Sequence, residues 1–237
     1  MIPQPAYLLH KRPYRETSAL VELITLEHGR VRAVAQGVQR AGSKSRGRLQ
    51  PFAPLHVTWQ GDRELKRLRL LESRGSVSLL AGEGLLCGLY ANELLTRLLP
   101  PLLPVPDVFA YYTAALDALT MPAQRAGALR RLELSLLEAL DSEPVFLDCR
   151  DQALDPQARY VYRPELRRFS STEEGWGMEG RALRLLAAGD WERPGLARVA
   201  RTLTRAALDT LLGERPLRSR ELMRALVARR RGERREV

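Results

Sequence analysis

The residues best suited to chemistry in this sequence are cations grouped near the N-terminus. Six of them fall within 19 residues that contain no Asp or Glu: Arg30, Arg32, Arg40, Lys44, Arg46 and Arg48. Guanidinium groups bind phosphate oxygens through paired hydrogen bonds, and each neutralised phosphate releases counterions. The pattern therefore predicts a surface that binds the backbone of a nucleic acid. A solvated charged loop is the alternative interpretation.

Arg15 adds a cation to this candidate site, beside the ring of Tyr14. In that position Tyr14 could stack on a base or simply be exposed to solvent. Trp59 lies in an alternating apolar pattern, so we expect it to pack in the core. A second basic run occupies residues 215–235, where a solvated tail is as consistent with the sequence as a DNA contact.

Signals for catalysis or metal binding are weak. His10, His28 and His56 are not at ligand spacing from one another or from a cysteine, and Cys87 and Cys149 are too few for a disulfide framework or a four-cysteine zinc site. The sequence has no Gly-x-Ser-x-Gly elbow, and its glycine-rich loop lacks the Gly-Lys-Ser/Thr ending of a phosphate-binding loop. We therefore expect a protein that is not an enzyme and that holds no metal or cofactor.

Charge is distributed unevenly along the 237 residues. The net charge of +10 is divided into +8 for residues 1–80, −3 for residues 81–212 and +5 for residues 213–237. This division favours polyanion-binding surfaces near the two ends over a uniformly basic coat. Since no segment reads as a membrane span or a signal peptide, we expect a cytoplasmic protein with no membrane partner.

Short strands must position the N-terminal cations. Apolar and β-branched runs alternate with turn signals at residues 6–10, 19–25, 30–35, 55–59 and 65–72. Five strands at this spacing fit a small closed barrel better than a sandwich. Between the third and fourth runs, residues 37–48 contain three glycines and four basic residues, which predicts a solvated loop.

From about residue 80 the apolar period becomes helical. Helices are expected over residues 85–99, 107–121, 122–140, 179–188, from 194 to Gly213, and from Ser219 onward, with Leu222 and Leu226 as the buried pair of the last one. The fold class is therefore α+β. We expect a barrel domain at residues 1–78 and a helical domain at residues 79–237.

Six motifs, taken together and in order, resemble the bacterial recombination mediator family RecO. They are Leu9–Ser18, Gly29–Arg32, Leu49–Leu55, Gly88–Leu95, Leu129–Glu133 and Pro216–Leu222. The resemblance covers most of the chain and implies an N-terminal OB-fold followed by a helical domain. It implies a mediator of DNA repair and recombination that binds single- and double-stranded DNA and anneals complementary strands.

The resemblance also implies protein partners. Family members work with RecR to load RecA onto DNA coated by single-strand-binding protein, whose acidic C-terminal tail docks on the helical domain. Arg130 matches a family position implicated in that docking, and Arg131 extends the prediction by adjacency. An arginine beside an apolar groove would suit an acidic tail that ends in an apolar residue.

One segment departs from the family pattern. Many members carry a four-cysteine zinc module where this chain, at about residues 149–171, keeps only Cys149. We therefore expect no zinc and an irregular insert held by packing, through Tyr160 and Tyr162.

The basic cluster leaves other functions open. An OB-fold protein that acts on structured RNA would present the same phosphate-binding surface, because both polymers carry phosphates. A phosphate-handling enzyme would need a divalent metal or a nucleotide, for which the sequence offers no ligand cluster. A purely structural scaffold would retain no DNA in a salt-dependent way.

Overall fold

The chain forms two compact units, and the first is assembled from residues far apart in sequence. The structure is a computed structural model that describes residues 2–40, 42–75 and 78–233, apart from the side chains of residues 44, 45, 70 and 230–233. Unit 1 combines Met1–Pro122 with Pro216–Val237, and unit 2 is Ala123–Arg215. The sequence-based division falls at residue 78, whereas this grouping by packing also assigns three long helices to the barrel's unit.

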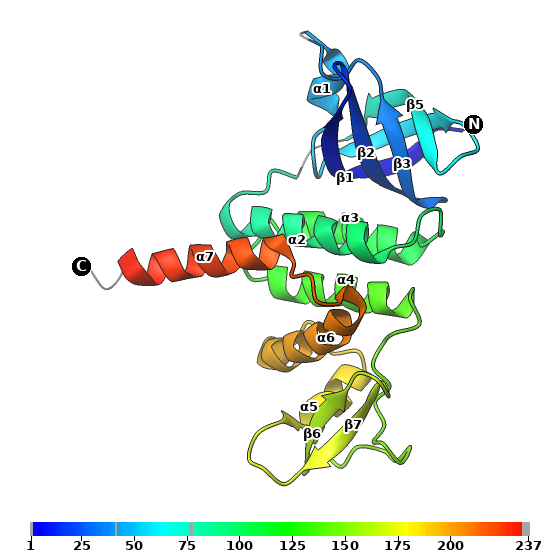
Figure 1. Cartoon of the computed structure of the whole chain (residues 1–237). Coiled ribbons are helices and arrows are strands. Elements are labelled where there is room, and N and C mark those ends of the chain that lie inside the picture. The colour runs from blue at the N-terminus through cyan, green and yellow to red at the C-terminus, as the bar shows by residue number, and fades with distance from the viewer. Residues whose placement is uncertain (1, 41, 76–77, 234–237) are drawn as a thin grey trace. The chain divides into compact units, whose positions relative to one another are not determined.

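A closed five-stranded barrel forms the N-terminal part of unit 1 (Figure 1). The strand order is β1-β2-β3-β5-β4, and β1 pairs with β4 to close it. All neighbouring strands are antiparallel except β3 and β5, which are parallel. This OB-like barrel confirms the expected fold class. Its strands are β1 (Gln4–Tyr14), β2 (Ser18–Thr25), β3 (Gly29–Ala35), β4 (Pro54–Gln60) and β5 (Leu65–Ser73).

Alternation of side chains builds the barrel core. Val21 and Leu23 of β2 and Val31 and Ala33 of β3 point inward and are fully buried, while the residues between them are more polar. Trp59 is also buried in this core, as predicted.

The segment expected to be a solvated loop is partly ordered. Residues 44–48 form the short helix α1 (Lys44–Arg48), and the next residue, Leu49, is fully buried. Arg48 Nη1 donates a hydrogen bond to Leu71 O at 3.0 Å, which ties α1 to β5. The expectation of a loop through residue 48 was therefore wrong, because an apolar residue and a backbone acceptor hold its end in place.

A buried polar network joins the barrel to two helices of unit 1, α2 (Gly82–Leu98) and α3 (Pro106–Ala118). Asn92 Nδ2 donates to Leu8 O at 3.3 Å and to Leu9 O at 3.0 Å, next to an irregularity in the pairing of β1 with β2. Tyr112 Oη donates to Asn92 Oδ1 at 2.6 Å. Asn92 and Tyr112 are both buried, so each of these bonds offsets a desolvation cost.

The C-terminal helix α7 (Arg218–Glu233) returns to unit 1 and packs on α2. Leu217, just before it, is buried. The expectation that Leu222 and Leu226 form the buried pair was wrong: Leu222 is 53% exposed and Leu226 is half-buried. In Figure 1 the first turns of α7 lie beside α2, and its later turns extend beyond that helix.

Unit 2 contains α4 (Arg125–Glu138), α5 (Gly180–Ala187) and α6 (Ala197–Leu212), with the 3-10 turn η1 (Pro194–Leu196) leading into α6. It also contains a three-stranded sheet of order β7-β6-β8. Its strands are β6 (Arg159–Arg163), β7 (Arg168–Thr172) and β8 (Met178–Glu179).

This sheet replaces the irregular insert expected at about residues 149–171. The β6 sequence Arg-Tyr-Val-Tyr-Arg alternates, and it places Tyr160 and Tyr162 in buried positions. The Tyr162 ring lies 5.3 Å from the Phe169 ring of β7, centroid to centroid. Apart from this sheet, the regular elements of the second half of the chain are helices, as expected. No described helix is long and apolar enough to cross a membrane.

Candidate nucleic-acid interface

The two ends of the barrel have different surroundings. At one end the β2–β3 turn packs on the α2–α3 connection so closely that a side-chain Cβ at Gly29 would overlap Leu103 O. At the other end the β1–β2 turn meets the loop after β3, where Gln39 N donates to Thr17 O at 3.0 Å and Gln39 Nε2 donates to Ser18 O at 2.7 Å. We call this second end the open end.

Four exposed arginines gather around the open end, and we call them the open-end cluster: Arg12, Arg15, Arg40 and Arg67. Strand pairing aligns Arg12 with Leu20, Leu20 with Val34, and Val34 with Arg67. Paired residues on neighbouring strands share a face, so a row crosses four strands with an arginine at each edge. Arg67 also donates to the side chain of Gln36, just after β3.

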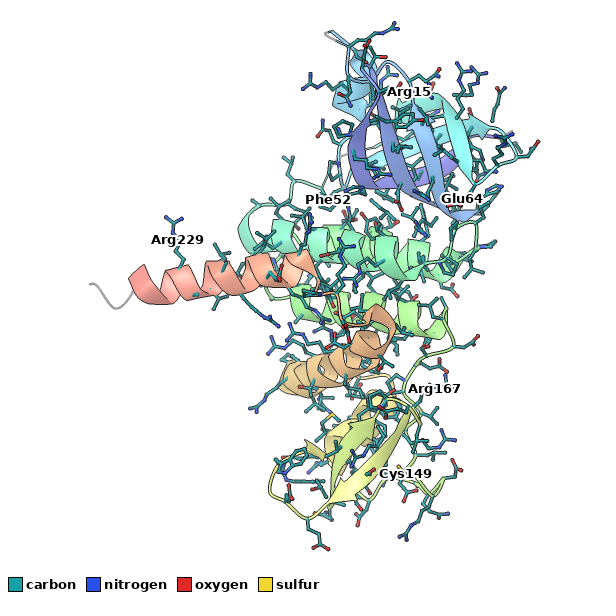
Figure 2. All side chains as sticks on the ribbon, viewed as in Figure 1. Arg15, Phe52, Glu64, Cys149, Arg167 and Arg229 are labelled. Atoms are coloured by element: carbon teal, nitrogen blue, oxygen red, sulfur yellow. The ribbon has the colours of Figure 1, made fainter. Side chains whose placement is uncertain are left out.

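The open-end cluster keeps its charge. Within the described part of the chain, none of its four guanidinium groups has a carboxylate oxygen within 4.0 Å. Arg15 lies in a turn with φ +53°, and its Cζ atom is 5.2 Å from the centroid of the Tyr14 ring. Figure 2 shows Arg15 at the end of the barrel that carries α1, with other nitrogen-tipped side chains around it.

Tyr14 is the one half-exposed aromatic among the described barrel residues. Tyr7, Phe52 and Trp59 are buried. Their rings are therefore unavailable for stacking on a base. The barrel surface thus offers many cations and a single aromatic ring, which Arg15 covers on one side.

Arg30 is the predicted site residue that the structure turns inward. Its Nη1 lies 2.6 Å from Glu22 Oε2, its Nε donates to Leu99 O at 2.7 Å, and its side chain is only 13% exposed. It thus ties β3 to the end of α2. Two of its five N–H donors therefore have partners inside unit 1, and the prediction that Arg30 binds DNA remains a prediction, with fewer donors left for a ligand.

The other predicted cations differ in how available they are. Arg32 is 36% exposed and lies 2.7 Å from Glu64 and 3.7 Å from Glu22, which partly neutralise it. Arg40 and Arg46 are exposed. Arg48 is exposed but binds Leu71 O. Lys44 begins α1, and its side chain is outside the described part of the structure.

Sequence reasoning missed Arg12 and Arg67. The alternation of Lys66, Arg67, Leu68 and Arg69 already indicated that Arg67 and Arg69 share a face of β5. The sequence does not indicate the parallel pairing of β3 with β5, and this pairing brings Arg67 beside Val34.

In unit 2, Arg130 is buried and Arg131 is not. The Arg130 side chain is 7% exposed and pairs with Glu133, whose other oxygen accepts a hydrogen bond from Thr204 of α6. Arg131 is 41% exposed and lies 2.6 Å from Glu192 Oε1. The depression beside Arg131 is lined by Gly189 and by three charged residues, Asp190, Glu192 and Arg193, and not by an apolar groove.

Cys149 is exposed, and its Sγ atom lies 3.4 Å from Ser170 Oγ, which also accepts a hydrogen bond from Arg163 Nε at 2.9 Å. Across the described residues, no three His, Cys, Asp or Glu side chains are grouped as metal ligands.

A small closed barrel with uncompensated arginines at one end is typical of OB-fold proteins that bind nucleic acids. Comparison with known families makes the class specific. The family described as "Recombination protein O N terminal" matches residues 1–77, and the one described as "Recombination protein O C terminal" matches residues 80–221. The chain therefore belongs to the recombination protein O (RecO) family of DNA repair proteins, which confirms the resemblance seen in its motifs.

Individual relatives match over nearly their whole length. The chain is 43% identical over 222 residues to the DNA repair protein RecO of Pseudomonas paraeruginosa, covering 92% of this chain and 93% of the relative. It is 40% identical over 231 residues to RecO of Nitrosococcus oceani, covering 95% and 94%. It is 38% identical over 234 residues to RecO of Chromobacterium violaceum, covering 94% of each chain.

Proposed function

We propose that the open-end cluster binds the phosphate backbone of DNA, and that through this contact the protein acts as a mediator of repair and recombination. The observation that carries the proposal is the difference between two sets of arginines on one barrel. Arg30 and Arg32 have carboxylate partners, whereas the four arginines of the open-end cluster have none in the described structure. Arginines without internal partners are available for external anions.

The mechanism has no chemical step, and the protein is not an enzyme in this proposal. Cations of the open-end cluster neutralise phosphates on one strand, which lowers the repulsion that a complementary strand meets on approach. Between Arg12 and Arg67 lie half-buried Leu20 and Val34, which are aliphatic. They offer the bases no aromatic ring to stack on, so the bases of a bound strand remain free to pair. Annealing of single strands and retention of duplex both follow from backbone binding.

The partner roles in this proposal come from family membership. The protein works with RecR to load RecA onto DNA coated by single-strand-binding protein, which places it in the cytoplasm. Two arginines are expected to bind the acidic tail of the coat protein. Arg131 is the accessible one, because Arg130 is buried in an ion pair with Glu133. The tail would have to displace Glu192 from Arg131.

A pair of charge reversals tests the DNA contact. Arg15→Glu/Arg67→Glu removes two cations from the open-end cluster, and Arg74→Glu/Arg150→Glu makes the same change in net charge at exposed positions elsewhere. If each lost phosphate contact lowers the logarithmic salt slope by about 0.7 on single strands, the cluster variant should lose about 1.4 units of slope. Fluorescence anisotropy with a labelled oligonucleotide at several salt concentrations measures this.

Two outcomes would reject the proposal. One is equal loss of binding in the cluster variant and in the control, which would indicate a general charge effect. The other is preference for an RNA competitor over single-stranded DNA of equal length, which would favour the alternative of an RNA-binding barrel.

A further inference from the structure

Unit 2 carries a group of exposed arginines, although residues 81–212 are acidic overall. Residues 123–179 contain eight arginines and 11 acidic residues, whereas residues 180–212 contain six arginines and three acidic residues. The excess of arginine in the second stretch belongs to α5, α6 and the turn between them. The net charge of −3 for residues 81–212 therefore does not reveal this local excess of arginine.

Three arginines of the second stretch share one face of α6. Arg198, Arg201 and Arg205 follow i, i+3, i+7 spacing and are exposed. We call them the α6 stripe. The buried residues of the helix occupy the opposite face: Ala200, Leu203, Thr204, Ala207 and Leu208. The helical rise separates the first and last arginine of the stripe by about 10 Å along the axis.

Carboxylates do not neutralise the start of this stripe. Arg198 and Arg201 have no carboxylate within 4.0 Å among the described residues. Two of the three acidic residues of the stretch are engaged elsewhere, since Asp190 pairs with Arg193 and Glu192 with Arg131. By contrast, three arginines in or beside the sheet of unit 2 all have acidic partners: Arg159, Arg167 and Arg168.

The neighbouring helix α5 carries two further exposed arginines. α5 packs against α6, and its two exposed arginines, Arg181 and Arg184, are one turn apart. Both also lack a carboxylate within 4.0 Å in the described structure. In the described part of unit 2, Arg150 and Arg163 in or beside the sheet also lack a carboxylate partner, but only α5 and α6 bring four such arginines onto two adjoining helices.

We propose that the α6 stripe, together with Arg181 and Arg184, is a second nucleic-acid-binding surface, which binds the phosphate backbone of a second strand. This inference rests on the proposed function, because it supplies the partner of the strand held at the open-end cluster. A molecule that holds both strands raises their local concentration relative to each other, which favours annealing over two independent encounters.

A nucleic acid suits this surface better than an acidic peptide does. A peptide that ends in an apolar residue needs an apolar groove beside the cation. In α5 and α6, Leu211 is the large apolar side chain with substantial exposure, at 38%, and it lies at the far end of α6 from Arg198. A row of like charges without such a groove matches the regular charges of a phosphate backbone.

The test compares three double variants of the full chain. Arg198→Glu/Arg201→Glu alters the α6 stripe, and Arg150→Glu/Arg163→Glu makes the same net charge change at exposed positions of the sheet region. Arg15→Glu/Arg67→Glu alters the open-end cluster. The probe is a labelled single strand of about 16 nucleotides, the upper site size of one OB-fold, and its complement. Binding stoichiometry at low salt and annealing rate are measured.

Wild type should bind two strands per chain, and the stripe variant only one. Annealing by the stripe variant should be slower by about tenfold or more. The loss of two phosphate contacts should also reduce the slope of its binding with salt concentration. The sheet control should match wild type. Unchanged stoichiometry and annealing in the stripe variant would overturn the inference and leave the proposed function intact.

The opposite pattern separates the two ideas. If the open-end variant binds and anneals normally while the stripe variant does neither, the second surface is real and the proposed role of the open-end cluster fails. If the stripe variant keeps both strands but loses binding of an acidic peptide that ends in an apolar residue, the surface is a peptide site and the inference is overturned.

Discussion

Burial decides what each arginine of this protein can do. The guanidinium of Arg130 is paired with Glu133 inside unit 2, where an unpaired charge would be costly. Arg30 is similarly fixed by Glu22 and Leu99 O. In the open-end cluster the same side chain faces water, and its charge is available to a ligand.

Removing Glu133 should strongly destabilise unit 2. Glu133→Ala leaves Arg130 buried without its partner, and we expect a loss of about 3–5 kcal/mol in the free energy of unfolding. The double variant Arg130→Met/Glu133→Leu should recover most of that loss, because no charge remains buried. Urea unfolding followed by circular dichroism measures both. Arg131→Ala, at the exposed neighbouring position, should cost no more than about 1 kcal/mol.

Gly29→Ala should loosen the contact of the barrel with the α2–α3 connection. Gly29 has φ +62°, and the added methyl group would overlap Leu103 O. We expect a loss of more than about 1 kcal/mol in thermal or chemical unfolding. Gly37→Ala is the matched control, since Gly37 has φ +68° but only ordinary contact distances to its nearest neighbour. Equal losses in both variants would show that backbone strain, and not the clash with Leu103, is responsible.

At the scale of elements, the barrel strands were predictable because β-branched residues alternate in them and turn residues separate them. The helices were predictable from their period and their ends: Pro194 begins η1, and Gly213, with φ +64°, ends α6. The β6–β7–β8 sheet was not predicted because turn-forming residues interrupt the apolar pattern of this segment, although Arg159–Arg163 alternates clearly.

The sequence could not indicate which cations the fold would occupy. Arg30 and Leu99 are 69 positions apart, and no local pattern connects them. The same holds for Arg67, whose place in the open-end cluster depends on parallel pairing of β5 with β3. Charge density along the chain therefore indicated Arg15 and Arg40 of the open-end cluster but not Arg12 and Arg67.

The attachment of α7 should depend on pH through Glu93. Its carboxylate accepts hydrogen bonds from the amides of Arg218 and Ser219 and from Ser219 Oγ. Burial raises the pKa of Glu93, but these hydrogen bonds together outweigh it and hold the pKa below its ordinary value of 4.5. The attachment is therefore fully supported above pH 4.5 and weakens as the pH falls through the lowered pKa.

Hydrogen exchange of the Arg218 and Ser219 amides measures this attachment. Glu93→Gln should lower the protection of these amides, relative to their intrinsic exchange rates, at neutral pH and remove the loss of protection on acidification. Glu221→Gln, at an exposed position in the first turn of α7, should leave both unchanged. Equal protection in wild type and Glu93→Gln at neutral pH would contradict the role given to Glu93.

At the scale of the whole molecule, unit 1 depends on a segment that follows unit 2 in the chain. Removing residues 216–237 takes away the buried Leu217 and leaves Glu93 without its donors. The loss of one buried leucine, about 1.5–3 kcal/mol, should lower the thermal midpoint by about 3–10 °C in differential scanning calorimetry. Removing only residues 228–237 should lower the midpoint less, since this shorter truncation keeps the buried Leu217 and the donors to Glu93.

The route of the chain also sets an order of events on the ribosome. The barrel emerges first, and a nascent domain can begin to fold while translation continues. Yet the part of α2 that packs on α7 stays uncovered until all of Ala123–Arg215 has been translated. The inserted unit must therefore be made, and can already have folded, before the unit that surrounds it in sequence is complete.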